Sequence, residues 1–167
     1  YLCSEIFGDP QPYVDFFIEK RYNLSNCFVL TKEDAPIGML HSFPCSLMVG
    51  KKSYSCRYLY YIGVLKQYRN LGLATKMINY AVDVQHSEGT DVFCLLPAND
   101  ALYKFYQKIG FQEFFKCGLI DISVEKKNLP SVNFSAEPDL NLFCKIRESF
   151  LASCKSYVKW DRHAIEY

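Results

Sequence analysis

The residues Arg69-Asn70-Leu71-Gly72-Leu73-Ala74 form the turn from which the rest of this sequence is best understood. The turn follows a strand-like run rich in Tyr and Val and opens a long amphipathic helix. The first N–H groups of a helix have no partner within it, and the helix dipole favours negative charge at that end. Gly72 allows the backbone to approach phosphates closely, and Arg69 can add charge-assisted hydrogen bonds. The turn therefore predicts a pyrophosphate-binding site.

The segment that begins at Leu96 makes this signal more specific. Leu96-Pro97-Ala98-Asn99 leads into a helical run that ends at Gly110-Phe111. Asn99 is a residue type that caps helix N-termini, and Gly110 is typical of a helix end. Tyr106 follows Asn99 by seven positions and so lies two turns further along the helix. A phosphate-binding helix followed by an Asn-capped helix is a more restrictive combination than either feature alone.

Hydrophobic periodicity predicts helices and strands whose early strands are antiparallel. Three consecutive strands joined by short turns form a meander, and Pro44 marks a bulge or an edge position. The apolar run after the central helix is predicted to be a buried strand parallel to the third strand. The predicted helices cover 11–22, 72–88, 100–109 and a last stretch from Leu140, and the predicted strands cover 27–31, 37–49, 54–65 (the longest), 92–96 and one or two segments within 111–124.

Composition argues against several classes of protein. Half of the residues are hydrophobic and 16% are aromatic, which supplies a packed core and argues against disorder. A formal net charge of +1 without a long basic cluster argues against nucleic-acid binding. The sequence shows no signal peptide and no run of about 18 apolar residues, so no membrane role is predicted.

Eight cysteines are spread along the chain, and the closest two are ten residues apart. Because no C-x-x-C pair exists, neither a metal site nor a dithiol motif is predicted. An even number permits disulfides, but most of these cysteines lie within apolar strand or helix patterns. Buried reduced thiols that behave as small hydrophobic side chains are therefore the favoured interpretation, and they indicate a cytoplasmic protein.

The chain has no initiating Met, and both of its ends look helical, so we expect an internal portion of a longer protein. Residues 1–124 carry the two motifs and form the expected main domain. Prolines and polar residues at 125–138 predict a linker. Residues 139–167 are then expected to begin a second lobe or a C-terminal extension.

The order of the predicted elements and the two motifs resemble the GCN5-related N-acetyltransferase (GNAT) superfamily. In that family the turn is written R/Q-x-x-G-x-G/A, which is here Arg69 to Ala74 after the strand Tyr61-Ile62-Gly63-Val64. An Asn then precedes a Tyr by seven residues before a Gly-Phe, as Asn99 precedes Tyr106 before Gly110-Phe111. The resemblance covers about residues 1–124.

The pattern from Leu96 to Phe111 looks most like the tandem acetyltransferases related to the enhanced-intracellular-survival proteins. Those proteins continue into a second acetyltransferase-like lobe. Compared with the family pattern, the first strand is absent before Tyr1 and no clear last strand follows Val124.

The resemblance implies a fold, a donor and a set of binding residues. The fold is α/β (α+β), with a mixed, mostly antiparallel sheet flanked by helices and with strands splayed around an acetyl-CoA groove. The donor substrate is acetyl-CoA, and no metal is implied. Backbone groups at Ile62 and Val64 hold the pantetheine arm, and Asn99 hydrogen-bonds it while capping its helix. The pyrophosphate is held by Arg69, Asn70, Leu71, Gly72, Leu73, Ala74 and Thr75.

The resemblance also implies direct attack of an amine on the thioester, with the Val64 N–H as oxyanion donor and Tyr106 as general acid. A phenol has a pKa of about 10 and a thiol about 8.5, so a hydrogen bond to the thiolate is favoured over complete proton transfer. The alternative for Tyr106 is an ordinary core position, because it shares a helical face with Phe105. No general base is identified. His41 lies on an apolar strand face and is interpreted as a core residue rather than as the base.

Two functions therefore compete: an N-acetyltransferase acting on an amine, and a non-catalytic acyl-CoA-binding or interaction lobe of a larger protein. Release of free thiol from the donor distinguishes them. A P-loop is excluded because no G-K-[ST] follows Gly72, and a Rossmann module is excluded because G-x-G-x-x-G is missing. The acceptor, a small-molecule or peptide amine, is expected near the loop 8–13, Tyr58 and Tyr60. The sequence neither requires nor excludes a homo-oligomer.

Overall fold

Three long strands form the centre of the fold. The computed structural model describes residues 1–115 and 139–166. β1 (Cys27–Lys32), β2 (Ala35–Val49) and β3 (Lys52–Val64) follow one another as an antiparallel meander, as predicted. The turn between β1 and β2 uses Glu33 and Asp34, both with positive φ (50° and 63°). Two such residues give a turn whose twist matches that of the flanking strands, so the hairpin can close in two residues.

Two further strands complete a five-stranded sheet in the order β1-β2-β3-β4, with β5 also paired to β2. β4 (Val92–Cys94) runs parallel to β3, and β5 (Ser156–Lys159) runs antiparallel to β2. A mixed, mostly antiparallel open sheet flanked by helices confirms the predicted fold class.

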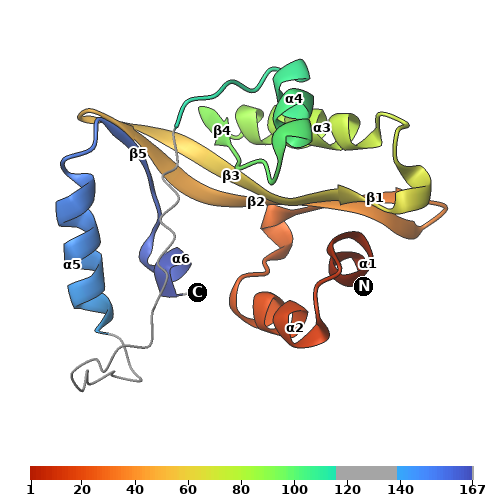
Figure 1. Ribbon diagram of the computed structural model, residues 1–167, viewed down its shortest axis with the longest axis horizontal. Helices are drawn as coiled ribbons and strands as arrows, with labels where there is room; N and C mark the ends of the chain where they lie inside the picture. Colours follow the sequence, from red (N-terminus) through yellow and green to blue (C-terminus); the bar gives the residue numbers. More distant parts are fainter. Residues whose placement is uncertain (116–138, 167) are drawn as a thin grey trace, which may run out of the picture.

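Helices cover both faces of this sheet (Figure 1). One face carries α1 (Leu2–Phe7) and α2 (Gln11–Lys20), and the opposite face carries α3 (Leu73–Ser87) and α4 (Asp100–Lys108). The short 3₁₀ turns η1 (Leu24–Asn26) and η2 (Lys66–Tyr68) connect elements, and α5 (Leu140–Leu151) and α6 (Arg162–Glu166) flank β5. None of the helices in the described part of the chain is long and apolar enough to cross a bilayer.

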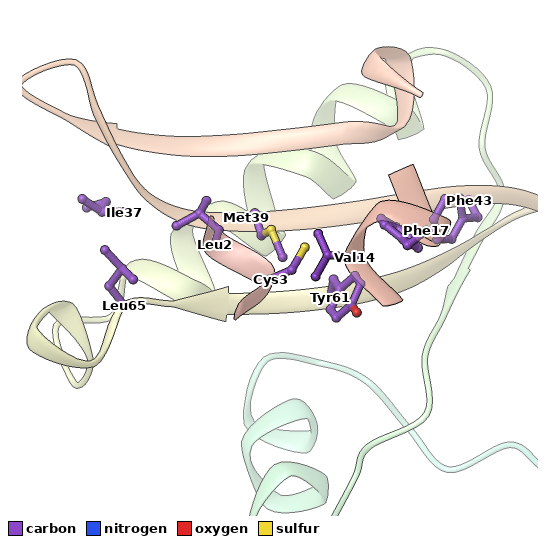
Figure 2. Packing of buried hydrophobic residues seen from close by; sticks show 9 residues of the cluster. All are labelled: Leu2, Cys3, Val14, Phe17, Ile37, Met39, Phe43, Tyr61 and Leu65. Carbon is purple, nitrogen blue, oxygen red and sulfur yellow. The ribbon is translucent and has the colours of Figure 1, made fainter. Parts of the chain in front are cut away.

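Each face of the sheet has its own apolar core. On the α1 and α2 face, side chains of both helices meet β2 and β3 (Figure 2), and this core consists of Leu2, Cys3, Val14, Phe17, Ile37, Met39, Phe43, Tyr61 and Leu65. On the other face, Leu40, Leu59, Met77, Ile78, Ala81 and Tyr106 form the core. A buried hydrogen bond from the Ser42 hydroxyl to Gln85 (2.6 Å) fixes α3 against β2 on that face. Both layers therefore hold β3 in place.

The structure corrects several predicted strands. β2 has 15 residues and β3 has 13, so the prediction that 54–65 is the longest strand is wrong. β4 ends at Cys94 rather than at Leu96, because the chain leaves β3 there. Residues 111–115 form no strand, since alternation alone does not supply a ladder partner, and the rest of the predicted segment 111–124 lies outside the described residues. The linker predicted at 125–138 lies outside them as well.

Pro44 occupies the position that its missing N–H requires. β1 pairs with β2 as far as His41, and β5 pairs with β2 only from Ser46 onward. Pro44 lies in the gap between them and, within the described part of the chain, is paired on one side alone, with Arg57 of β3. The predicted edge position is thus confirmed inside a strand that is otherwise central.

The sequence did not predict β5. Its pairing with β2 places part of the segment 139–166 in the same sheet as the main domain. The guanidinium carbon of Arg21 lies 4.3 Å from the ring centroid of Phe43 and 5.4 Å from that of Trp160, so the residue after β5 also packs near α2. The predicted division of the chain into 1–124, 125–138 and 139–167 stays a prediction.

Candidate active site

A slot opens where β3 and β4 part. The two strands are paired at only three positions, from Cys56 opposite Val92 to Tyr58 opposite Cys94. Beyond these positions the strands diverge around a cavity of about 480 Å³. Its lining is mainly aromatic and aliphatic, and consists of Phe7, Asp9, Tyr13, Tyr58, Leu59, Tyr60, Tyr61, Ile62, Leu95, Leu96, Pro97, Ala98, Leu102 and Tyr106. We call this cavity the slot.

A β-bulge shapes the β3 wall of the slot. Met39 pairs with Gly63 and His41 pairs with Tyr60, so the single residue Leu40 opposes two residues of β3. One of these two, Tyr61, has a φ of 50°. A bulge interrupts the regular ladder and bends its strand, which redirects backbone and side-chain groups. The bend occurs within the part of β3 that lines the slot.

The tyrosine at the bulge is hydrogen-bonded to a carboxylate that lines the slot. Tyr61 is 8% exposed, and its hydroxyl donates a hydrogen bond to the Asp9 carboxylate. Burial, followed by the Asp9 hydrogen bond, raises the pKa of Tyr61, so the phenol keeps its proton. The hydroxyls of Tyr13 and Tyr60 lie 3.4 Å apart beside it. Among the described residues that line the slot, Asp9 alone carries a charge.

The turn Arg69–Ala74, which the sequence predicts to bind pyrophosphate, has the geometry expected for an anion site. Gly72 is the N-cap of α3 with a φ of 72°, and Asn70 has a φ of 63°. No side chain of the described residues caps this end of α3, which leaves the first helical N–H groups available to a ligand. A Cβ on Gly72 would meet no atom within 4 Å, which shows open space at the turn. The Arg69 Nε donates to the Val64 carbonyl oxygen at 3.1 Å, which fixes the turn to the end of β3.

Tyr106 lies on α4 where the helix meets the slot. The side chain is 8% exposed and packs against Phe105 and Phe111, with ring centroids 5.1 and 5.8 Å away. Burial, and to a smaller extent the nearby Tyr58 phenol, raises the pKa of Tyr106. Tyr106 therefore belongs both to the core and to the slot lining, so the two sequence-based interpretations describe the same position.

Of the remaining predicted residues, some line the slot and others do not. Ile62 lines the slot, whereas Val64 is buried at the end of β3 and is not part of the lining. The Asn99 side chain accepts a hydrogen bond from the Leu102 N–H (3.0 Å), which confirms the predicted cap, but Asn99 does not line the slot. Residues 69–75 lie together at the start of α3.

His41 lies in the core rather than in the slot. It is 2% exposed and packs against the Phe17 ring with centroids 5.1 Å apart. Its Nδ1 has no hydrogen-bond partner among the described residues. Burial lowers the pKa of His41 to about 4, so the ring is neutral near pH 7. The structure therefore agrees with the interpretation of His41 as a core residue.

Sequence reasoning missed Asp9, the bulge at Tyr61 and a cluster of cysteines. Asp9 lies within the loop 8–13, near which the acceptor is expected, but the sequence pattern gives its carboxylate no role. Seven of the cysteines lie in the described residues and all are free, in agreement with the predicted reduced thiols. Three of them, Cys45, Cys56 and Cys94, place their Sγ atoms within 4.8 Å of one another, next to the closed end of the slot. Their spacing would allow them to hold a metal ion.

Comparison with known proteins gives consistent matches. A family model described as an acetyltransferase (GNAT) domain matches residues 2–114. N-alpha-acetyltransferase 50 of Danio rerio is 34% identical over 58 residues, which cover 33% of this chain and 34% of that protein. The chain thus matches about a third of the length of this curated relative.

Solved structures share the fold at low sequence identity. An aminoglycoside antibiotic 6′-N-acetyltransferase from Acinetobacter haemolyticus superposes with a TM-score of 0.57 at 19% identity and covers 74% of this chain and 89% of that chain. A GCN5-related N-acetyltransferase from Anabaena variabilis superposes with a TM-score of 0.56 at 19% identity and covers 62% of this chain and 26% of that chain.

Proposed function

The chain belongs to the acetyltransferase (GNAT) domain family, and we propose that it moves an acetyl group from acetyl-CoA to an amine by direct attack. Two observations carry this proposal: the slot between β3 and β4, and the uncapped start of α3, whose turn is fixed to the end of β3 by the Arg69–Val64 hydrogen bond. A thioester on an extended pantetheine arm needs a narrow cleft, and its diphosphate needs donors at one end. The slot supplies the cleft, and the uncapped start of α3 supplies the donors.

The donor substrate is proposed to bind with its diphosphate at the first N–H groups of α3. Gly72 permits the close approach, and the Arg69 guanidinium adds positive charge although its Nε is already bonded to Val64. The pantetheine arm lies along the β4 side of β3, where the described residues supply no ladder partner beyond Tyr58, although β2 stays paired on the other side. The proposed binding set is Ile62, Val64, Arg69, Asn70, Leu71, Gly72, Leu73, Ala74, Thr75 and Asn99. A backbone edge without a partner supplies hydrogen bonds that an amide-containing arm can use.

The proposed reaction is a single displacement at the thioester carbonyl. The amine lone pair attacks the carbonyl carbon, the C–S bond breaks and the thiolate leaves. A backbone N–H of β3 stabilises the oxyanion; Val64 is the sequence-based candidate, and Ile62, which lines the slot, is the alternative. Tyr106 donates a hydrogen bond to the departing thiolate. Since burial raises the pKa of Tyr106, its proton stays on the phenol and complete transfer is disfavoured.

The acceptor is proposed to enter between the loop that carries Asp9 and the aromatic residues of β3. Tyr13 and Tyr60 border this entrance, and the Asp9 carboxylate attracts a cationic group. A small-molecule or peptide amine with a further positive charge fits this end of the slot. The similar solved structure named for an aminoglycoside acceptor and the relative named for an N-terminal α-amine represent these two kinds of acceptor.

The finer assignment to the tandem, survival-type acetyltransferases rests on the residue pattern from Leu96 to Phe111. The cytoplasm is the proposed location, in line with seven free thiols among the described residues. A second lobe beyond residue 139 belongs to the same proposal and is not needed for the chemistry assigned to the slot.

The decisive test is the release of CoA thiol from acetyl-CoA, measured with a thiol reagent across a panel of mono- and polyamines and peptides. An acetyltransferase gives thiol and acetylated amine in equal amounts. Calorimetry of acetyl-CoA binding runs in parallel. Binding without thiol release with every amine would favour the competing interpretation, a non-catalytic acyl-CoA-binding lobe, and absence of binding would reject both.

A further inference from the structure

Three thiols meet at the closed end of the slot although no local sequence motif joins them. Cys45 of β2 and Cys56 of β3 are directly opposite in the antiparallel ladder. Cys94 of β4 is opposite Tyr58, two residues along from Cys56. The Sγ atoms of Cys56 and Cys94 lie 3.6 Å apart, and all three sulfur atoms lie within 4.8 Å of one another. Three adjacent strands thus each point one thiol to a common centre.

These distances suit a metal ion bound by thiolates. Zinc–sulfur bonds are about 2.3 Å long, so three sulfurs around one ion stand roughly 3.8–4.0 Å apart. The Cys56–Cys94 separation of 3.6 Å is slightly below this range and the other separations do not exceed 4.8 Å, so small side-chain rotations would bring the sulfurs to it. Thiolates are soft ligands that select ions such as Zn(II) and Cu(I) over Mg(II) or Ca(II).

Burial of the cluster allows both retention and entry of an ion. Cys56 is 1% exposed, whereas Cys45 and Cys94 are partly exposed. An ion can therefore enter past the outer thiols and rest against the inner one. The proposed acetyl transfer uses none of the three residues, so their convergence is not explained by that reaction.

We propose that Cys45, Cys56 and Cys94 form a three-thiolate site for one soft, thiol-seeking metal ion, Zn(II) or Cu(I). On binding, each thiol gives its proton to the solvent and forms one sulfur–metal bond, and no electron is transferred. The ion joins β2, β3 and β4 at the point where β3 and β4 begin to part. Because β4 is paired to β3 through only three residues, such an ion would fasten the weakest strand of the slot.

The site is independent of the acceptor and of the acetyl-transfer chemistry. Its alternative is that the three thiols only pack as small hydrophobic side chains. The two possibilities can be distinguished by experiment. A bound ion would protect all three thiols from alkylation together, whereas packing alone would not make their reactivities change together.

The experiment uses the whole protein, stripped of metal with a chelator under anaerobic, reducing conditions and then titrated with Zn(II) or with Cu(I). We expect one ion per chain and a higher melting temperature with the ion bound. Alkylation followed by mass spectrometry should show Cys45, Cys56 and Cys94 protected together by the ion. Cys144 and Cys154, which lie outside the cluster, serve as internal controls and should alkylate equally with and without the ion.

The test variant is Cys94→Ser, and the matched control is Cys154→Ser. The first should weaken binding of the preferred ion at least tenfold in a chelator competition and abolish the thermal shift, whereas the second should change neither. Equal binding by Cys94→Ser, no bound ion with either metal, or a Cys45–Cys56 disulfide in freshly isolated protein would each overturn the proposal. If Cys94→Ser fails to fold, the alkylation pattern of the unmodified protein decides alone.

Discussion

The two ends of β3 are held in opposite ways. At its closed end, from Cys56 to Tyr58, β3 is paired with β2 on one side and with β4 on the other. At its open end, beyond Tyr58, β2 is the only partner within residues 1–115 and 139–166, Tyr61 adopts a φ of 50° and the slot begins. One strand therefore serves as scaffold at one end and as binding surface at the other.

This difference shows how a sheet can provide a binding cleft without losing its core. A backbone group used in a ladder is unavailable to a ligand, and an unpaired group buried without a partner is costly. The departure of β4 and the bulge leave backbone groups at the open end without a β4 partner. The apolar core on the α1 and α2 face still packs against this part of β3. The closed end is consolidated by the Arg57 guanidinium, which donates to Asn26 (3.0 Å) and to the Ser42 carbonyl (3.3 Å). If this comparison is correct, changes at the two ends should separate stability from function.

The largest expected effect is a decrease in the free energy of unfolding at acid pH. It arises at His41, which is paired with Tyr60 at the open end of β3. Burial lowers the pKa of His41 from its ordinary 6.5 to about 4 in the folded state. Between these values the unfolded state binds more protons, so the stability is complete above pH 6.5 and is lost as the pH falls toward 4. The difference amounts to about 3 kcal/mol.

Denaturant unfolding between pH 7 and pH 4 measures this loss, and His41→Phe should remove most of it while keeping an aromatic ring against Phe17. Hydrogen exchange at pH 4.5 should show earlier loss of protection at residues 60–64 than at residues 56–58. Equal loss at both ends would contradict the comparison.

Local signals in the sequence predicted the parts of the fold that depend on a few neighbouring residues. The N-cap at Asn99, the turn at Gly72 and the meander of β1 to β3 were all predictable, because caps, left-handed glycines and alternation act over short distances. Ile62 and Tyr106 were placed at the same groove through the family resemblance, and the structure brings both into the slot lining.

The rest depends on strand register, which the sequence does not display. The bulge arises because Leu40 opposes two residues of β3, and β4 is short because the chain leaves β3 after Cys94. Cys45 and Cys56 are eleven residues apart in sequence and become opposite each other only in the ladder. β5 has four residues, too few for a periodic signal, and is defined by its pairing with β2.

A second prediction tests the chemistry assigned to the open end. Tyr106→Phe removes a hydroxyl and preserves the ring that packs against Phe105 and Phe111. We expect kcat to fall about 100-fold, as is usual for loss of a group that acts on the leaving atom. The KM for acetyl-CoA should change much less, because the hydrogen bond forms as the thiolate develops.

Tyr103→Phe on the same helix is the matched control, since Tyr103 does not line the slot. Steady-state thiol release measures both variants, and thermal melts establish that both remain folded. An unchanged kcat in Tyr106→Phe would leave Tyr106 as a core residue only.

A third prediction compares the two ends of α3. Gly72 stands at its start with a φ of 72°, and Gly89 follows its end with a φ of 95°, near the closed end of β3. A Cβ would meet no atom within 4 Å at either position, so alanine brings the same kind of backbone strain, about 1–2 kcal/mol, to both.

Both Gly72→Ala and Gly89→Ala should therefore lose similar stability, whereas only Gly72→Ala should weaken acetyl-CoA binding, by roughly tenfold or about 1.4 kcal/mol. Calorimetric titration with acetyl-CoA and urea unfolding separate the two quantities. Equal acetyl-CoA affinity in the two variants would contradict the proposal that the diphosphate binds at the start of α3.

The smallest expected effect lies at the closed end and should appear in stability alone. Arg57→Met keeps the aliphatic stem but deletes the hydrogen bonds to Asn26 and to the Ser42 carbonyl. Because Arg57 is only half-buried, water replaces part of this bonding, and a loss of about 1 kcal/mol is expected. Lys52→Met, an exposed change on the same strand, should alter stability by less than about 0.5 kcal/mol. Urea unfolding gives both values, and acetyl-CoA affinity should be equal in the two variants. A drop in affinity with Arg57→Met would mean that the closed end transmits its geometry into the slot, so that scaffold and binding surface on β3 are coupled rather than separate.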